Sequence, residues 1–232
     1  MKFLTKVTRF SLSSKSSFII TSEVLVGIIT CLLSLLIFLI FTKEVLEKDI
    51  VLLDHQISLF VYSLRSPELT AVMFFITSFG DRILLILTAL VIMIFSIKNH
   101  KKEAVLFGVA LAMGAIINGV FKEMAQRPRP ALAPLAIERT YSFPSGHAMN
   151  SFIFYALLSY FSYHFFRNRK ISLFISTTCA LLIILIGFSR IYLGVHYFTD
   201  VIAGYFAGFW WFITILLVEY SLVFYKLFKK SE

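Results

Sequence analysis

The stretch Tyr141–Asn150 (YSFPSGHAMN) places a serine, a glycine and a histidine between a proline and a long apolar run. That order predicts a loop followed by the start of a helix. A helix N-terminus presents unpaired N–H groups and a partial positive charge, so a phosphate there could be held by Ser145, Gly146 and the first turn. His147 would stand beside it. The stretch therefore predicts a phosphate cradle next to a titratable imidazole.

A second polar segment, Ser189–Asp200, interrupts the apolar sequence further along and carries another histidine with a carboxylate. His196 and Asp200 are four residues apart at the predicted start of a helix, which would place them on one face within side-chain reach. A carboxylate bonded to one imidazole nitrogen fixes the tautomer and leaves the other nitrogen free as a nucleophile. His147 lacks such a partner nearby in sequence, so we expect it to protonate the leaving group and later activate water.

Three cations, Lys122, Arg129 and Arg190, flank these histidines in the sequence. Each has an ordinary structural interpretation when taken alone: Lys122 as a snorkelling helix end, Arg129 as a lipid-headgroup contact. Together in one partly dry pocket they would repel one another unless an anion were bound. A phosphoryl group would accept hydrogen bonds from all of them, and the cations would stabilise its transition state.

The composition is that of a membrane protein: 59% of the 232 residues are hydrophobic and 26 are Phe. We predict an all-α, polytopic fold with six transmembrane helices. Lys43–Pro67 has the spacing of amphipathic helices on the outer interface between spans 1 and 2, and whether it forms a lid stays open. Leu69–Gly80 is predicted as an interfacial half-helix. The spans are predicted at residues 24–41, 83–97, 104–121, 148–166, 171–188 and 201–224.

The formal charge of +9 comes from basic residues spread over short segments and not from one basic face, which argues against nucleic-acid binding. The N-terminal tail, Lys98–Lys102, Arg167–Lys170 and the C-terminal tail all fall on one side of a six-span layout. The positive-inside rule makes that side cytoplasmic. The segments that carry the candidate catalytic and phosphate-binding residues then lie together on the extracytoplasmic side of a cell-membrane protein.

These patterns give domain boundaries: a cytoplasmic tail at residues 1–17, a membrane domain at 18–228 with catalytic segments 122–147 and 189–200, and a cytoplasmic tail at 229–232. Pro128, Pro130, Pro134 and Pro144 predict that Lys122–Pro144 is a loop. Arg127 within it is interpreted as a solvated loop residue in preference to a headgroup contact, and Asn118 as part of an interhelical hydrogen bond. Cys31 and Cys179 are expected to be buried thiols with no disulfide or metal role.

The segments K-x6-RP, PSGH and SR-x5-H-x3-D match, in order and spacing, the signature of the type 2 phosphatidic acid phosphatase superfamily, which the chain therefore resembles. The resemblance implies a lipid phosphate phosphatase in which His196 forms a phosphohistidine, Asp200 orients it and His147 serves the leaving group. It also implies that Lys122, Arg129, Ser145, Gly146 and Arg190 bind phosphate, with no metal and no other cofactor. Vanadium-dependent haloperoxidases share the signature but are soluble, and six spans argue against that branch.

The expected activity is hydrolysis of lipid phosphate monoesters or pyrophosphates in the outer leaflet, for example phosphatidylglycerophosphate, phosphatidic acid or undecaprenyl pyrophosphate. The expected partners are the lipid substrate and the bilayer, without an obligate protein partner. Two alternatives stay open at this point. One is a transferase that passes the phosphoryl group or headgroup to another lipid, and the other is a transporter, which would need polar residues at mid-membrane depth.

Overall fold

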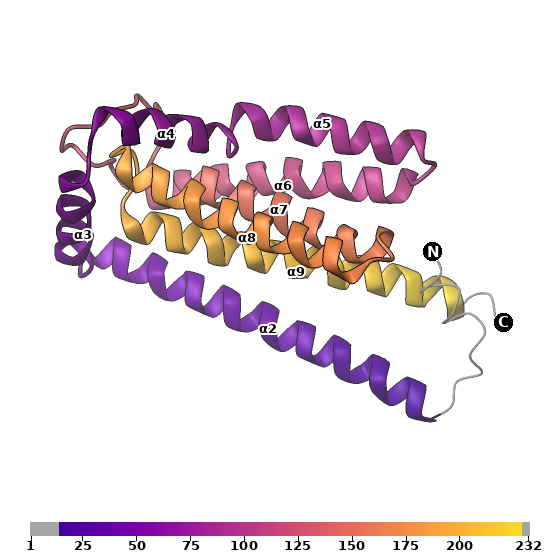
Figure 1. Cartoon of the computed structure of the whole chain (residues 1–232). Coiled ribbons are helices and arrows are strands. Elements are labelled where there is room, and N and C mark those ends of the chain that lie inside the picture. The colour runs from indigo at the N-terminus through magenta and orange to yellow at the C-terminus, as the bar shows by residue number, and fades with distance from the viewer. Residues whose placement is uncertain (1–13, 229–232) are drawn as a thin grey trace.

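The computed structural model describes residues 14–228, with side chains for residues 22–221, and over this range the regular secondary structure is entirely α-helical (Figure 1). The all-α prediction is thus confirmed for the described residues. Most of the predicted N-terminal tail and the whole C-terminal tail, residues 1–13 and 229–232, lie outside this range. The helices are α2 (Ser14–Glu47), α3 (Val51–Ser63), α4 (Pro67–Ser78), α5 (Arg82–Ile97), α6 (Lys101–Ala125), α7 (Gly146–Phe165), α8 (Arg169–Tyr192) and α9 (Phe198–Phe228).

Among the residues that the structure describes, five segments are long and apolar enough to cross a membrane: one within α2, then α4 with α5 as a single stretch, α6, α8 and one within α9. α7 has 20 residues, is not among these five, and packs against α5, α6, α8 and α9. Large side chains such as Leu32, Leu36 and Leu39 of α2 are about half exposed, and an apolar surface of this extent suits lipid rather than water. The chain is a multi-pass membrane protein.

Two boundaries near the site differ from the sequence prediction: α8 continues past residue 188 to Tyr192, and α6 continues past Lys122 to Ala125. The helix ends where Gln126 takes a left-handed conformation, two residues before Pro128, since the residue before a proline disfavours helix. Lys122 therefore lies on a helix, and the irregular segment, here called the catalytic loop, comprises residues 126–145.

α3, α4 and the catalytic loop gather at one end of the bundle (Figure 1). α3 lies across this end, whereas the short turns between α5 and α6 and between α7 and α8 lie at the other end. The basic turns predicted to share one side thus do lie at a common end, away from the catalytic loop.

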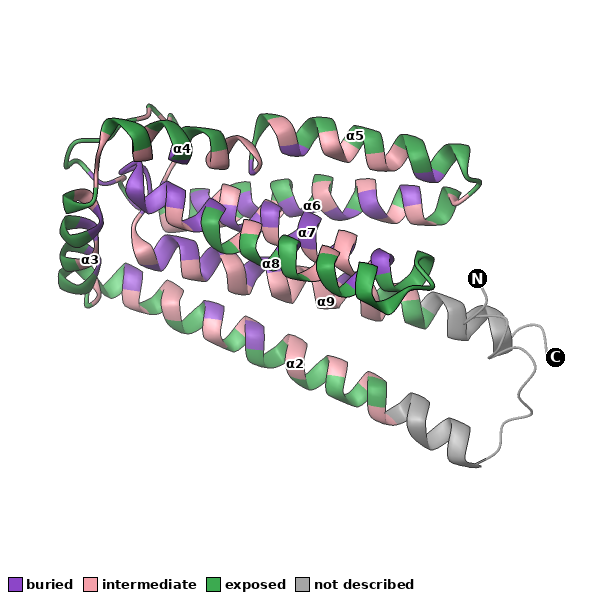
Figure 2. Cartoon of the chain, in the orientation of Figure 1, coloured by how far each residue is buried: buried purple, intermediate pink, exposed green. Residues whose placement is uncertain are grey.

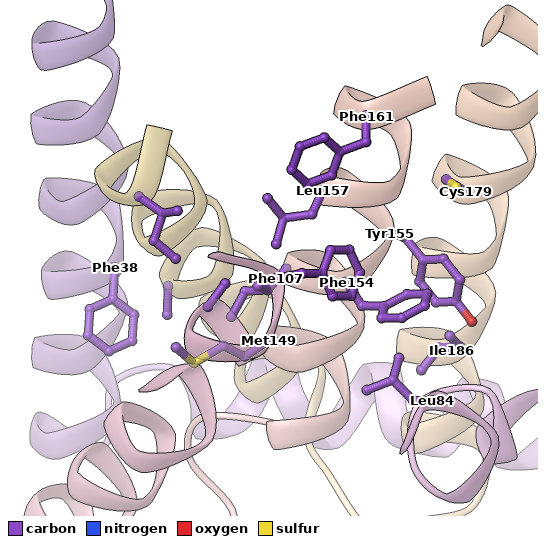
Figure 3. Packing of buried hydrophobic residues seen from close by; sticks show 14 of the residues in the cluster. Phe38, Leu84, Phe107, Met149, Phe154, Tyr155, Leu157, Phe161, Cys179 and Ile186 are labelled. Carbon is purple, nitrogen blue, oxygen red and sulfur yellow. The ribbon is translucent and has the colours of Figure 1, made fainter. Parts of the chain in front are cut away.

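The core is aromatic and is built around α7 (Figures 2 and 3). Phe154 packs edge-to-face on Phe107 of α6 with ring centroids 5.3 Å apart, and Phe161 packs on Phe95 of α5 at 5.2 Å. Figure 2 shows burial concentrated on α7 and on the parts of α8 and α9 nearest α3. The best-packed part of the molecule is therefore next to the catalytic loop.

α9 approaches α7 so closely that two of its positions must be glycine. A Cβ on Gly204 would lie 2.8 Å from the backbone oxygen of Ser145, and one on Gly208 would lie 2.8 Å from that of Met149. This small-residue spacing is typical of tight helix contacts in membranes. It brings the backbone of α9 directly against the segment that carries PSGH.

Candidate active site

His196 lies in the turn between α8 and α9, and not on a helix face as its spacing from Asp200 had suggested. Asp200 lies in the first turn of α9, and its Oδ2 accepts a hydrogen bond from the backbone N–H of Tyr197 at 2.9 Å. This cap folds the turn back over the helix start. The pairing itself is as predicted, with Nδ1 of His196 3.5 Å from Oδ2 of Asp200.

The other ring nitrogen of His196, Nε2, faces Nη1 of Arg129 at 3.2 Å. A guanidinium has only donors, so Nε2 is the acceptor and carries the free electron pair. Nδ1 then carries the hydrogen that points toward Asp200. The tautomer is therefore the one that a nitrogen nucleophile needs.

The imidazole of His196 is 2% exposed, and this burial lowers its pKa from 6.5 to about 4 despite the opposing effect of Asp200. Asp200 is completely buried and accepts hydrogen bonds from Ser142 Oγ and, at 2.6 Å, from Nη1 of Arg127. A buried carboxylate with this many donors stays ionised and fixed in place. Because the pKa of His196 is about 4, its imidazole ring is uncharged at neutral pH.

Ser145 is the N-cap of α7, and its hydroxyl accepts from the N–H of Ala148 at 3.4 Å. Its own N–H donates to the backbone oxygen of Asp200 at 3.0 Å, which joins the PSGH segment to α9. Asn118 of α6 donates to the backbone oxygen of Pro144, just before α7, at 3.4 Å; its interhelical contact is to Met149 Sδ of α7 at 3.6 Å. The start of α7, with His147 in its first turn, is thus held from two sides.

The cations converge on the same place. Lys122 is buried and donates to the backbone oxygen of Tyr141, while Nη1 of Arg190 donates to Thr77 Oγ1 of α4 at 2.9 Å. Lys122, Arg129, Arg190 and His196 are all close enough to His147 to act on it electrostatically. The structure therefore brings together all the residues that the sequence selected: Lys122, Arg129, Ser145, Gly146, His147, Arg190, His196 and Asp200.

Glu138 of the catalytic loop was not foreseen. Its carboxylate pairs with Nη2 of Arg190 and lies 3.9 Å from Nη2 of Arg129. Partial burial would raise the pKa of Glu138, but Arg190, with smaller contributions from Arg129 and His196, holds the pKa below its ordinary value. The cations thus have an anionic partner inside the protein, at the place where a phosphate is expected. The only sequence signal is an acid within a loop that is otherwise basic.

Arg127 corrects the prediction of a solvated loop residue, because it is 8% exposed and pairs with two carboxylates, those of Asp200 and Asp54. Burial alone would lower the pKa of Arg127, but these carboxylates raise it above its ordinary value. Asp54 was missed although a signal existed. It shares a helical stripe with Ile50, Ile57 and Val61, and a carboxylate on the apolar stripe of an amphipathic helix needs a buried partner.

Two cavities border Arg129, one of about 190 Å³ next to Glu138 and Gly194 and one of about 420 Å³ next to Glu123 and Tyr141. At one end of the bundle the structure thus combines a histidine beside a carboxylate, buried cations and a helix N-terminus, which are the features that phosphoryl transfer needs. The model of the PAP2 superfamily matches residues 103–224, and the chain belongs to this family.

Among known proteins, the chain is similar to phosphatidylglycerophosphatase B of Bacillus subtilis (strain 168), with 34% identity over 178 residues, 75% of this chain and 86% of that protein. It is 32% identical to the lipid A 4'-phosphatase of Porphyromonas gingivalis over 126 residues, which are 48% of this chain and 50% of that one.

Solved structures agree on the fold. The crystal structure of the transmembrane PAP2 type phosphatidylglycerolphosphate phosphatase from Bacillus subtilis aligns with a TM-score of 0.77 and 30% identity, covering 82% of this chain and 96% of that one. Aquifex aeolicus LpxE aligns with a TM-score of 0.58 and 26% identity, covering 71% and 94%. The family is thus supported by both sequence and fold.

Proposed function

We propose that the protein hydrolyses the terminal phosphate of membrane lipid phosphates or pyrophosphates through a phosphohistidine on His196. The class of enzyme, a lipid phosphate phosphatase, follows from membership of the PAP2 family and from relatives that carry this activity in their names. The observation that supports the mechanism is the unprotonated Nε2 of His196, which accepts from Arg129 on the side of the cations while Asp200 lies on the opposite side of the ring.

In the first step Nε2 of His196 forms a bond to phosphorus while the bond from phosphorus to the lipid oxygen breaks. His147 takes up a proton as the anionic phosphate binds among the cations, and it gives this proton to the departing oxygen. In the second step His147 takes a proton from water, the resulting hydroxide binds phosphorus, and the electron pair of the P–N bond returns to Nε2. Each step is an in-line displacement. The first leaves His147 without its proton, ready to accept one from water, and the second restores unmodified His196 and protonated His147.

The charge of the transferring phosphoryl group is stabilised by Lys122, Arg129 and Arg190, together with the N–H groups at the start of α7. These fixed cations fill the role that Mg²⁺ has in many phosphoryl-transfer enzymes, so we expect turnover in excess chelator. A phosphate has to replace the carboxylate of Glu138 on Arg190, since both anions need the same donors.

The lipid chain enters from the bilayer, and the headgroup occupies the two cavities beside Arg129. The relatives named for phosphatidylglycerophosphate and lipid A show that the family handles phosphates on bulky lipids. We take phosphatidylglycerophosphate, phosphatidic acid and undecaprenyl pyrophosphate as the substrate class.

The topology we propose has six crossings, with α7 as the sixth alongside the apolar segments of the bundle. Both termini are then cytoplasmic and the catalytic loop is extracytoplasmic, with α3 at the outer interface. Support comes from the basic turns at the end of the bundle away from the catalytic loop.

The direct test is phosphate release by purified protein in detergent, in excess chelator, from phosphatidylglycerophosphate and undecaprenyl pyrophosphate. Wild-type protein should release phosphate, and His196→Ala should abolish release. His55→Ala is the matched control, because His55 is an exposed histidine on α3. Retained turnover by His196→Ala would refute the assignment of the nucleophile.

A further inference from the structure

Asp54 of α3 has no role in the mechanism proposed above. Its carboxylate is nevertheless completely buried, next to Arg127 and Thr199. Its Oδ1 accepts from the N–H of Thr199 at 3.0 Å, and its Oδ2 accepts from Thr199 Oγ1 at 2.5 Å. Oδ2 also accepts from Nη2 of Arg127 at 2.6 Å. A carboxylate buried this deeply must have every such partner to remain ionised.

Arg127 connects Asp54 to Asp200, which in turn contacts His196. Its Nη2 serves Asp54 while its Nη1 serves Asp200 at 2.6 Å and Thr199 Oγ1 at 2.9 Å. The ring of Tyr197 lies 4.2 Å from the guanidinium carbon and covers one face of it. A continuous series of contacts therefore runs from Asp54 through Arg127 and Asp200 to His196.

The charges along this series show why a second carboxylate matters. If Arg127 paired with Asp200 alone, its positive charge would cancel the negative charge that holds the Nδ1 hydrogen of His196. Because Asp54 shares the guanidinium, the group of two carboxylates and one arginine keeps a net charge of −1. That charge favours the imidazolium character that develops as Nε2 bonds to phosphorus.

The hydrogen bonds between Thr199 and Asp54 also connect Asp54 to the orientation of Asp200. Thr199 and Asp200 are adjacent in the first turn of α9, so the two hydrogen bonds from Thr199 to Asp54 also set the direction of the Asp200 side chain. α3 is thereby fixed to the start of α9 through buried bonds. These contacts make α3 a part of the site's support and not a freely moving lid.

We propose that Asp54 is a positioning residue for the nucleophile: through Arg127 and Asp200 it keeps His196 in the orientation and charge state needed for attack on phosphorus. The proposal rests on the proposed function. Asp54 has no contact with Lys122, Arg190 or the start of α7 among the described hydrogen bonds, so it should affect the rate of the chemical step and not the binding of phosphate.

The test is Asp54→Asn, assayed for phosphate release from phosphatidylglycerophosphate. Asn keeps an oxygen for the Thr199 N–H but loses the charge that Arg127 requires. We expect kcat to fall about tenfold with KM unchanged, the scale typical of outer partners of catalytic groups. Asp49→Asn is the matched control, since Asp49 is an exposed acid five residues earlier in the same segment, and it should leave both constants unchanged.

A double-mutant cycle separates positioning from a purely structural role. If Asp54 acts through Asp200, adding Asp54→Asn to Asp200→Asn should lower kcat no further. Independent, multiplying effects, a rise in KM alone or an unchanged kcat in Asp54→Asn would each overturn the proposal.

If Asp54→Asn does not yield folded protein, Thr199→Val removes only the hydroxyl contacts, and it should lower kcat with KM unchanged; an unchanged kcat would again overturn it. Wild-type protein without phosphate release would instead refute the proposed function.

Discussion

Nη1 of Arg129 lies 3.2 Å from Nε2 of His196, so a cation stands directly against the nitrogen that we assign as nucleophile. The same guanidinium donates to the backbone oxygens of Val195, Thr140 and Tyr141, which fix its plane. We expect this arginine to turn its N–H from Nε2 to the oxygens of a phosphoryl group that arrives there. Attack and charge stabilisation would then share one preorganised contact.

We predict that Arg129→Lys lowers kcat about 100-fold, comparable to the loss of one preorganised donor to a developing oxyanion. Lysine keeps the charge but cannot reproduce the planar fork that spans the backbone oxygens and Nε2. Steady-state phosphate release measures the effect. Arg167→Lys is the control, because Arg167 is exposed in the turn between α7 and α8 at the other end of the bundle, and it should behave as wild type. Equal activities of the two variants would contradict a role for the fork.

The depressed pKa of His196 gives a stability prediction with a definite sign. Its pKa is 6.5 when unfolded and about 4 when folded, so the unfolded state binds the proton more readily. The contribution of His196 to stability is fully present above pH 6.5 and is lost as the pH falls toward 4. We expect the melting temperature of wild-type protein to drop over this window and that of His196→Gln to drop less. His55→Gln, which changes an exposed histidine, should keep the wild-type slope. Identical slopes for wild type and His196→Gln would rule out the depressed pKa.

The contact between α9 and α7 predicts that Gly204→Ala disturbs the phosphate cradle. The new methyl group would lie 2.8 Å from the backbone oxygen of Ser145 and 3.0 Å from the Cβ of Ala148, so the start of α7 has to move. Phosphate release and melting temperature should both fall. Gly119→Ala on α6 meets nothing within 4 Å and is the control that should preserve both. Wild-type activity in Gly204→Ala would show that the cradle does not depend on this contact.

Sidedness can be tested with single cysteines at exposed positions. Ile137 of the catalytic loop is 94% exposed, and Asn99 is exposed in the turn between α5 and α6 at the other end of the bundle. In intact cells a membrane-impermeant thiol reagent should label Ile137→Cys, and it should label Asn99→Cys only after permeabilisation. The reverse pattern would place the active site in the cytoplasm.

Much of the fold and site could be predicted from sequence because the signals are local. Apolar runs bounded by basic turns located the helices, and the spacing within PSGH and SR-x5-H-x3-D located the polar groups at helix ends. The structure adds pairings that no local pattern contains. Glu138 lies on Arg190, and Asp54 meets Arg127 across 73 residues of chain. Such contacts depend on how helices cross, which is why Arg127 was wrongly expected to be solvated.

Boundaries were less predictable for a physical reason. Lys122 lies within α6 because helix propensity continues until the chain approaches Pro128, and His196 lies before α9 because Asp200 caps the turn through Tyr197. In both cases the catalytic group stays close to its expected partners. The residues that the sequence selected therefore lie together, although the elements that carry them were predicted wrongly.

The stereochemical course at phosphorus tests the proposed mechanism most directly. A lipid thiophosphate made chiral with two oxygen isotopes is hydrolysed in water that carries the third, and the configuration of the released thiophosphate is determined. Attack by His196 followed by attack by water inverts phosphorus twice, so we predict net retention. Net inversion would mean that water attacks the lipid phosphate in a single displacement, and no phosphohistidine on His196 could then lie on the reaction path.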